Sequence, residues 1–300
     1  MPKKILHMLT PHKHVSPFDA NMAADAGYDL ILPYENVELT EVADLVQDAI
    51  FSRPPTSGTS TTIFFGGDDA ILALDMMEAA KNALVPPFGV HVFADPQGSF
   101  TTAAAMVACV EKILVAKKGR GLAGRRVAVF GATGVVGYCS AVTAALEGAE
   151  VTLVGHSGAQ RVRERAAQMK VRFGVDVDAV NGKTDAEKAA VLANTDIVFS
   201  AAKAGVRVLT AKQLEAAPGL LVVADVNAVP PAGIEGVGVF DNGTPMPGGE
   251  TLGLGALAIG NVKYQTEASL FRRMLSSENE VLALDFRDAF KLAQTLVPDL

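Results

Sequence analysis

The sequence predicts an α/β protein of two domains, each built around a parallel sheet. Apolar runs of strand length alternate with segments of helical periodicity along most of the 300 residues, and this alternation favours parallel pairing with helices on both faces. The stretch LVAKKGRGLAGRR interrupts the alternation without any core spacing, which predicts a domain boundary near Lys118–Arg125. A second α/β series then begins with a glycine-rich turn.

Four strands and four helices are expected before this boundary. Pro17 suits the first turn of a helix, Thr40 is a candidate cap, and Ser99 or Thr101 would cap the last and longest helix. The expected strands are Ile5–Leu9, Tyr28–Pro33, Ile63–Phe65 and Val90–Ala94, and the expected helices are Pro17–Ala26, Thr40–Phe51, Asp68–Leu84 and the stretch from Ser99 to Lys118.

Beyond the boundary, strands are expected at Val127–Phe130, Val151–Val154, Asp196–Ser200 and Leu220–Asp225, with helices at Val135–Glu147 and Ala159–Phe173. The C-terminal FRRMLSSENEVLALDFRDAFKLAQTLV predicts two helices, which we expect to return to the first domain. The predicted domains are therefore residues 1–118 completed by 272–300, and residues 119–271.

Composition restricts the class of protein. Hydrophobic residues make up 49% of the chain and charged residues 20%, which is typical of a globular protein with a large core. The formal net charge of -7 argues against a nucleic-acid partner. The apolar run near the start is too short for a signal peptide or a membrane span, so we expect a cytoplasmic protein without a membrane partner. Cys109 and Cys139 are expected to be buried, reduced thiols.

The glycine turn predicts a dinucleotide site. Gly131, Thr133, Gly134 and the start of the next helix (Val135, Val136 and Gly137) follow a strand directly, which is the setting that gives such a motif its meaning. The free N–H groups at a helix start can bind phosphates, and Gly134 would let the backbone approach a pyrophosphate. The spacing departs from G-x-G-x-x-G because Ala132 holds the first glycine position. A tight turn without a ligand is the alternative.

No acidic residue ends the second strand of this series. A carboxylate there would bind the ribose 2′-hydroxyl of NAD and repel a 2′-phosphate. His156 and Ser157 stand at that place, followed by Arg161, and all three side chains can bind a phosphate. We therefore predict that the site accepts NADP, with NAD as a second cofactor. An exposed helical arginine is the alternative interpretation of Arg161.

Two later strand ends are candidate edges of the cofactor site, since ligands of open parallel sheets lie beyond the carboxyl ends of the strands. Ala201 and Ala202 are small residues suited to a nicotinamide or its ribose, and Asp225 and Asn227 are polar residues before a proline pair. Ordinary loop chemistry is the alternative for both.

In the first domain, Asp95-Pro-Gln97-Gly-Ser99-Phe-Thr-Thr102 places an acid, an amide and three hydroxyls where a strand meets a helix, as a polar heterocycle would require. Ser-Pro-Phe18-Asp19 supplies a second such loop, and an N-cap is the alternative for the hydroxyls. Lys263 is the lone charge after a stretch of small apolar residues, where a surface lysine is the alternative. His7, His12 and His14 have no carboxylate or cysteine at ligand spacing, so no metal site is expected.

Several long motifs resemble the NAD(P)-dependent methylene-tetrahydromethanopterin dehydrogenases of bacterial one-carbon metabolism. They are ILHMLTPHKHVSPFDANMA, DPQGSFTTAAAMVA, ADVNAVPPAGI, GALAIGNVKYQT and LDFRDAFKLA, and together they cover nearly the whole chain. The resemblance implies a homo-oligomeric enzyme with a Rossmann-type cofactor domain, which oxidises the methylene bridge of a pterin to a methenyl bridge.

The resemblance also implies residue roles. Lys263, Asp19 and Thr102 fall at pterin-side positions and are the catalytic candidates. The polar loops described above supply the substrate-binding candidates Asp95, Gln97, Ser99 and Phe18. The Gly131–Gly137 turn and Ser157 fall at cofactor positions. Two alternatives stay open at this point. One is a methylene-tetrahydrofolate dehydrogenase, perhaps with cyclohydrolase activity; the other is a non-catalytic NADP-binding sensor.

Overall fold

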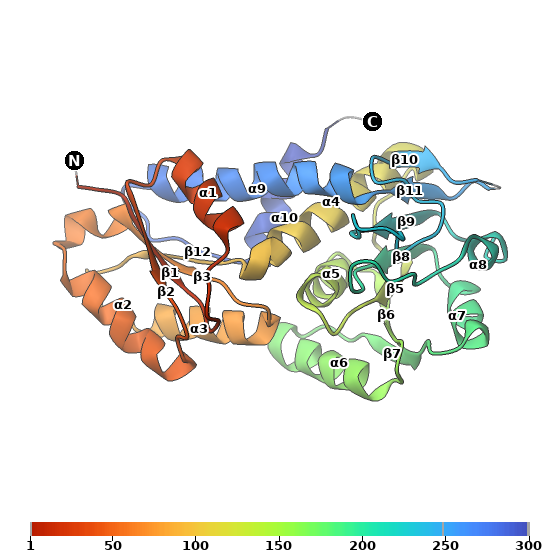
Figure 1. The fold of residues 1–300 in the computed structure, drawn as a ribbon, viewed down its shortest axis with the longest axis horizontal. Helices are drawn as coiled ribbons and strands as arrows, with labels where there is room; N and C mark the ends of the chain where they lie inside the picture. The colour runs from red at the N-terminus through yellow and green to blue at the C-terminus, as the bar shows by residue number, and fades with distance from the viewer. Residues whose placement is uncertain (1, 248, 299–300) are drawn as a thin grey trace. The chain divides into compact units, whose positions relative to one another are not determined.

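The computed structural model describes residues 2–247 and 249–298 and confirms the α/β class (Figure 1). The chain divides into two compact units. Unit 1 comprises Met1–Thr101 and Tyr264–Ala289, and unit 2 comprises Thr102–Lys263 and Phe290–Leu300. These limits differ from the predicted 118/119 and 271/272, because two long helices, α4 (Ser99–Lys118) and α9 (Ala256–Ser276), run without a break from one unit into the other. The predicted return of 272–300 to the first domain holds only as far as Ala289, because α10 (Phe286–Leu296) also continues into unit 2.

Unit 1 contains a five-stranded sheet in the order β12-β4-β3-β1-β2, in which every pairing is parallel. The strands β1 and β3 lie in the middle and the short β12 is at one edge. Their bounds are β1 (Ile5–Leu9), β2 (Leu30–Tyr34), β3 (Thr61–Phe65), β4 (His91–Ala94) and β12 (Ala283–Leu284).

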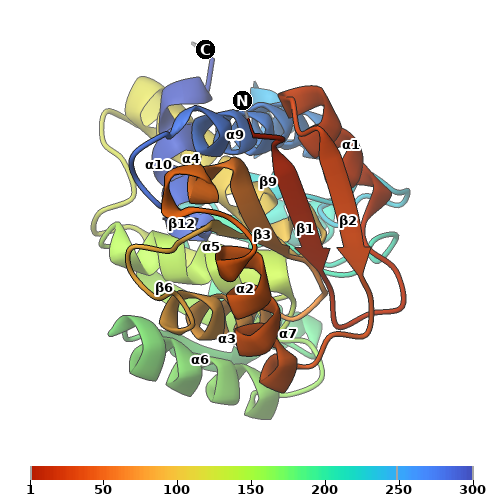
Figure 2. The same cartoon turned by 90° about the vertical axis from the view of Figure 1, so that its left-hand side faces the viewer.

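Helices cover both faces of this sheet, as Figure 2 shows. On one face lie α2 (Val42–Phe51) and α3 (Ala70–Asn82). On the other lie α1 (Pro17–Ala26) and the C-terminal half of α9. Phe271 of α9 packs its ring 5.8 Å from that of Phe64 and 5.3 Å from that of Phe93, so α9 is anchored to β3 and β4. Each such buried aromatic pair stabilises the fold by about 0.5–1.5 kcal/mol in addition to the effect of burying its apolar area.

Two of the predicted helix caps in unit 1 were wrong. Thr40 does not cap α2; a 3-10 turn, Leu39–Glu41, precedes it, and Glu38 and Glu41 form the capping box of that turn. The first N–H groups of α4 are bound by neither Ser99 nor Thr101. Oδ1 of Asp95 accepts from the N–H groups of Phe100 and Thr101 at 2.8 and 3.2 Å, because the further 3-10 turn Pro96–Gly98 brings its carboxylate over the helix end.

The strand β12 was missed because two residues carry no periodicity. It lies between α9 and α10 (Phe286–Leu296) and pairs with β4. Nδ1 of the buried His91 accepts a hydrogen bond from the N–H of Leu282 at 3.0 Å, which fixes the returning segment to the sheet. Burial lowers the pKa of His91 from its usual 6.5 to about 4, so the ring is neutral in the folded protein at pH 7.

We expect acid to destabilise the protein in part through His91. Its folded pKa is depressed, so the contribution to stability is complete above pH 6.5 and is lost as the pH falls to about 4. The loss should reach about 3 kcal/mol at most, at 1.36 kcal/mol for each unit of pKa shift. Urea unfolding at several pH values checks this. The decline between pH 6.5 and 4 should be shallower in His91→Asn, and equal slopes would assign the acid sensitivity to other groups.

Unit 2 contains a seven-stranded sheet in the order β10-β11-β9-β8-β5-β6-β7, parallel except for the edge strand β10. Without β10 this is the 3-2-1-4-5-6 order of a Rossmann fold. The bounds are β5 (Arg126–Phe130), β6 (Glu150–Gly155), β7 (Asp178–Asn181), β8 (Ile197–Ser200), β9 (Val222–Asp225), β10 (Asn242–Pro245) and β11 (Leu252–Leu254).

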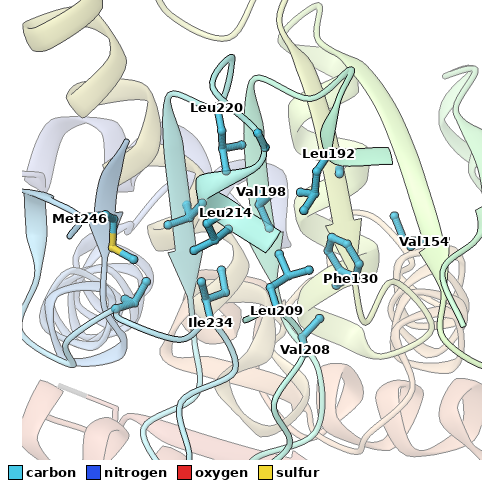
Figure 3. Close-up of a cluster of buried hydrophobic side chains, with 14 residues drawn as sticks. Phe130, Val154, Leu192, Val198, Val208, Leu209, Leu214, Leu220, Ile234 and Met246 are labelled. Carbon is cyan, nitrogen blue, oxygen red and sulfur yellow. The ribbon is translucent and has the colours of Figure 1, made fainter. Parts of the chain in front are cut away.

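Helices lie on both faces of this sheet (Figure 1). On one face lie α5 (Val135–Leu146) and α6 (Gln160–Phe173), and on the other α7 (Asp185–Leu192) and α8 (Ala211–Glu215). Figure 3 shows the core between the sheet and the second pair, where Phe130 and Val198 of the strands face Leu192 and Leu214 of the helices. Five elements of this unit were not predicted because they are short or largely exposed: β7, β10, β11, α7 and α8.

Both cysteines are free and buried, as predicted, and burial raises the pKa of the Cys109 thiol to about 12. Cys109 lies in α4, which is long and apolar enough to cross a membrane by length and composition alone. Most of that helix is buried within the fold, as in the core helix of a soluble protein.

Candidate functional site

The glycine turn lies where the order of the unit 2 sheet reverses. The neighbouring strands β5 and β8 connect to opposite sides, and the loops after them meet. This is the place where open α/β sheets bind ligands. Gly131 has a φ of +87°, and an added Cβ would lie 2.3 Å from the carbonyl oxygen of Ala201, so only glycine fits there.

The other two glycines serve different purposes. A Cβ on Gly137 would lie 2.5 Å from the carbonyl oxygen of Gly131, so this glycine lets α5 approach the turn. A Cβ on Gly134 would meet nothing closer than that same oxygen, at 3.5 Å, and the backbone of Gly134 is extended. The fold therefore does not require a glycine at 134. The absent side chain of Gly134 leaves open space at the start of α5, where a bound phosphate would accept hydrogen bonds from the free N–H groups.

A cavity of about 680 Å³ opens beside this turn. It is bounded by the ends of β5, β6 and β8 and by the segment after β7. Four basic side chains line it, Lys183, Lys188, Lys203 and Arg207, and none of the Asp and Glu residues that the structure describes does so, although the chain carries a net charge of -7. A cavity of this size and charge fits a large anionic ligand such as a dinucleotide.

A smaller hollow adjoins the cavity at the end of β6. Ser157 and Arg161 line it, His156 lines both spaces, and all three side chains are exposed. No acidic residue lines the hollow. Where a 2′-hydroxyl would need a carboxylate, the structure offers a hydroxyl, an imidazole and a guanidinium, which suit a phosphate.

Most predicted cofactor residues gather at these two spaces. Those that line them are Gly131, Thr133, Gly134, His156, Ser157, Arg161, Ala201 and Ala202, while Val135, Val136 and Gly137 form the first turn of α5. The four basic residues were missed. Their signal was weak because three lie in loops, and the strand before Lys183 was itself not foreseen.

Asp225 and Asn227 line neither space. The carboxylate of Asp225 accepts from the N–H groups of Asn227 and Ile234 at 3.2 and 3.0 Å, and burial raises its pKa. Oδ1 of Asn227 accepts from the N–H of Gly205 at 3.2 Å, which ties the loop after β9 to the loop after β8. Asp225 therefore holds the loop after β9 together, and Asn227 fixes this loop to the loop after β8, which lines the cavity.

The substrate-side candidates of unit 1 lie at one edge of its sheet. Phe18 and Asp19 follow β1, and Asp95, Gln97 and Ser99 follow β4, with the end of β3 between them. Asp19 is 1% exposed in the first turn of α1, whereas Phe18 is 47% exposed. Gln97 is exposed with a φ of +51°, which is rare outside glycine. Oδ2 of Asp95 accepts from the Thr101 hydroxyl at 2.6 Å, so this carboxylate organises the start of α4.

Thr102 and Lys263 lie in the two continuous helices, each as a terminal residue of the segment that belongs to unit 2. Thr102 is half-buried in the first turns of α4. Lys263 is only 8% exposed in α9, which rules out a surface lysine, since a buried charge is kept only with a partner or for function. Nε2 of His12 lies 2.8 Å from Oδ1 of Asp68 at the same sheet edge as Asp19. Within residues 2–247 and 249–298, no group of three or more His, Cys, Asp or Glu could hold a metal ion.

Comparisons with known proteins agree with these features. The family model for the N-terminal part of methylene-tetrahydromethanopterin dehydrogenase matches residues 17–97. The chain is 56% identical over 293 residues, 98% of each protein, to the NAD(P)-dependent methylenetetrahydromethanopterin dehydrogenase of Methylorubrum extorquens. The chain belongs to this dehydrogenase family. It is also 33% identical to the bifunctional protein MdtA of the same organism, over 99% of this chain and 100% of that one.

Solved structures of more distant sequence share the fold of this dehydrogenase. NAD-dependent malic enzyme from Thermotoga maritima matches with a TM-score of 0.59 and 13% identity, covering 98% of this chain and 84% of that one. Shikimate 5-dehydrogenase from Listeria monocytogenes matches with a TM-score of 0.51 and 13% identity, covering 98% and 96%. The Rossmann-type organisation that the glycine turn predicted is thereby confirmed.

Proposed function

We propose that the protein oxidises methylene-tetrahydromethanopterin to methenyl-tetrahydromethanopterin and transfers the hydride to NAD(P)⁺. Membership of the dehydrogenase family supports the reaction and the use of NAD(P). One structural observation supports a preference for NADP: among the residues that the structure describes, four basic side chains and no acidic one line the cavity beside the glycine turn.

The chemistry requires few catalytic groups. The methylene carbon lies between two nitrogen atoms, whose lone pairs stabilise the cation left when the hydride departs. The nicotinamide ring supplies the hydride acceptor when the cofactor is bound. The protein has to hold the reacting carbons about 3–3.5 Å apart and to exclude water. The glycine turn and the loops after β8 and β9 would fix the cofactor for this purpose.

The roles of the substrate-side residues rest on the family resemblance and on burial. We propose that the carboxylate of Asp19 stabilises the methenyl cation electrostatically and that Lys263 binds a polar group of the pterin. Thr102 is the third catalytic candidate, and Phe18, Asp95, Gln97 and Ser99 are proposed to contact the pterin. Burial supports Asp19 and Lys263, at 1% and 8% exposure, because an ionised side chain is costly to bury without a purpose.

A spectroscopic assay of the pure protein tests the reaction. The methylene forms of tetrahydromethanopterin and of tetrahydrofolate are each combined with NAD and with NADP. We expect turnover with methylene-tetrahydromethanopterin and a lower Michaelis constant for NADP than for NAD. Turnover confined to the folate would contradict the proposal, as would turnover with neither pterin despite normal cofactor binding.

Replacing Ser157 by Asp should raise the Michaelis constant for NADP by about tenfold, because a carboxylate at the end of β6 repels a 2′-phosphate. The constant for NAD should stay unchanged or fall. Steady-state kinetics with both cofactors measures the two constants, and Ser157→Asn is the uncharged control of similar size. If NADP is used equally well by Ser157→Asp, Ser157 lies away from the ribose.

We also propose a cytoplasmic homo-oligomer. The resemblance supports the oligomer, and light scattering on the purified protein measures its mass. The composition of the chain supports the location.

A further inference from the structure

Lys183 lies next to the end of β6 although it is 26 residues further along the chain than Ser157. Strand β7 pairs with β6 in the register that places Asn181 opposite Gly155. The N–H of Gly182 then donates to the carbonyl oxygen of Gly155 at 3.0 Å. The residues that follow in the two strands, Lys183 after β7 and His156 after β6, therefore leave the sheet side by side. Both line the 680 Å³ cavity.

Local structure holds Lys183 in this place. A Cβ on Gly182 would lie 2.2 Å from Cγ1 of Val154, so only glycine lets the segment after β7 pass this close to β6. The N–H groups of Lys183 and Thr184 both donate to Oε2 of Glu187, at 3.0 and 2.8 Å, in the capping box of α7. The backbone position of Lys183 is thus fixed from both sides while its side chain remains exposed.

The four basic residues of the cavity differ in what they bind. Nζ of Lys188 donates to the carbonyl oxygen of Val208 at 2.7 Å. The guanidinium of Arg207 donates to the carbonyl oxygen of Ala232 and lies 3.0 Å from the carboxylate of Glu235. Within the described part of the chain, the ammonium groups of Lys183 and Lys203 make no hydrogen bond or ion pair. These two are the ones available to a ligand, and only Lys183 adjoins the turn that carries Ser157.

We propose that Lys183 binds the 2′-phosphate of NADP and gives the enzyme its selectivity for NADP over NAD. This inference rests on the proposed function only in taking NADP as the cofactor. A carboxylate at the end of β6 would accept from the 2′-hydroxyl of NAD; in this protein an ammonium group from the neighbouring strand offers charge-assisted hydrogen bonds to a phosphate instead. Ser157 and Arg161 would hold the same phosphate from the other side of the β6 turn.

Binding measurements without the pterin test this directly. Calorimetry on the full-length protein gives dissociation constants for NADP, NAD and adenosine 2′,5′-bisphosphate, in the parent and in Lys183→Ala. We expect Lys183→Ala to weaken NADP and the bisphosphate by roughly tenfold and NAD by less than twofold, and Lys183→Glu to weaken the first two further. The loss should shrink at high salt, because the contact is exposed.

Two other lysines provide the comparison. Lys203→Ala, in the loop after β8, should affect NAD and NADP alike, and Lys212→Ala, on α8 outside the cavity, should affect neither. Equal losses of NAD and NADP in Lys183→Ala, or unchanged NADP binding in the folded variant, would overturn the assignment. So would a loss of NADP selectivity in Lys203→Ala alone. If the protein does not oxidise the pterin but Lys183→Ala still weakens NADP more than NAD, the proposed function is contradicted and this inference stands.

Discussion

The Gly134→Val variant is expected to fold normally and to lose at least 100-fold in affinity for NADP and for NAD. Gly134 begins α5, where the structure leaves room for a Cβ, and its extended backbone suits valine. The bulk would instead occupy the place of the pyrophosphate and remove its hydrogen bonds to the helix start. Each charge-assisted hydrogen bond contributes about 1.5–3 kcal/mol, so the loss of two accounts for this factor. Calorimetry with both cofactors measures it.

The other glycines of the turn supply a matched comparison. Gly137→Ala should lower the melting temperature, because its Cβ would lie 2.5 Å from the carbonyl oxygen of Gly131 and 2.9 Å from Cα of Ala132. Gly134→Ala should keep the parent melting temperature and show a smaller loss of affinity than Gly134→Val. Normal NADP affinity in a folded Gly134→Val protein would place the pyrophosphate elsewhere.

The Lys263→Ala variant is expected to lose roughly 10- to 100-fold in kcat/KM for the pterin and to keep its affinity for NADP. Loss of one hydrogen bond from a charged group costs about 1.5–3 kcal/mol, which corresponds to this range. A contact made only in the transition state would lower kcat and kcat/KM together, whereas a plain binding contact would raise KM alone. Steady-state kinetics with NADP held at saturation separates the two cases.

Stability measurements distinguish catalysis from packing at this position. Lys263 is 8% exposed, so its removal could also disturb α9, and Lys263→Met keeps the length and apolar volume of the stem. Both variants should melt close to the parent while losing activity, and Lys263→Arg should recover part of it. The surface variant Lys170→Ala is the control. Low melting temperatures with normal kinetics for each folded molecule would make Lys263 a structural residue.

The sequence alone determined the elements whose signals are local. Short-range periodicity predicts the series of strands and helices and the two-unit α/β organisation, and residues at fixed spacing predict the glycine turn. These features could therefore be predicted without coordinates. The sequence also predicted that the site accepts NADP, since no acidic residue follows β6 in Gly155-His156-Ser157. The long motifs then led to the dehydrogenase family.

Tertiary structure decided what depends on residues distant in sequence. Asp95 was predicted to contact a heterocycle, and only the structure shows that its carboxylate also accepts hydrogen bonds from the first N–H groups of α4, because a 3-10 turn folds it back over the helix. Asp225 was predicted at the edge of the cofactor site, and only the structure shows that it is buried and that its carboxylate accepts two hydrogen bonds from the backbone of the following loop. A polar residue after a strand can bind a ligand or the backbone, and only the fold decides which.

The basic residues that line the cofactor cavity could not be predicted from the sequence, because tertiary structure brings them together. Lys183 reaches the end of β6 through the pairing of two strands, and Lys203 and Arg207 reach the cavity through the loop after β8. No spacing in the sequence joins these residues, because strand order in a sheet is set by the burial of whole faces and not by neighbouring residues. The sequence therefore predicted a nucleotide site at the turn, and the assembled sheet decided which charges surround it.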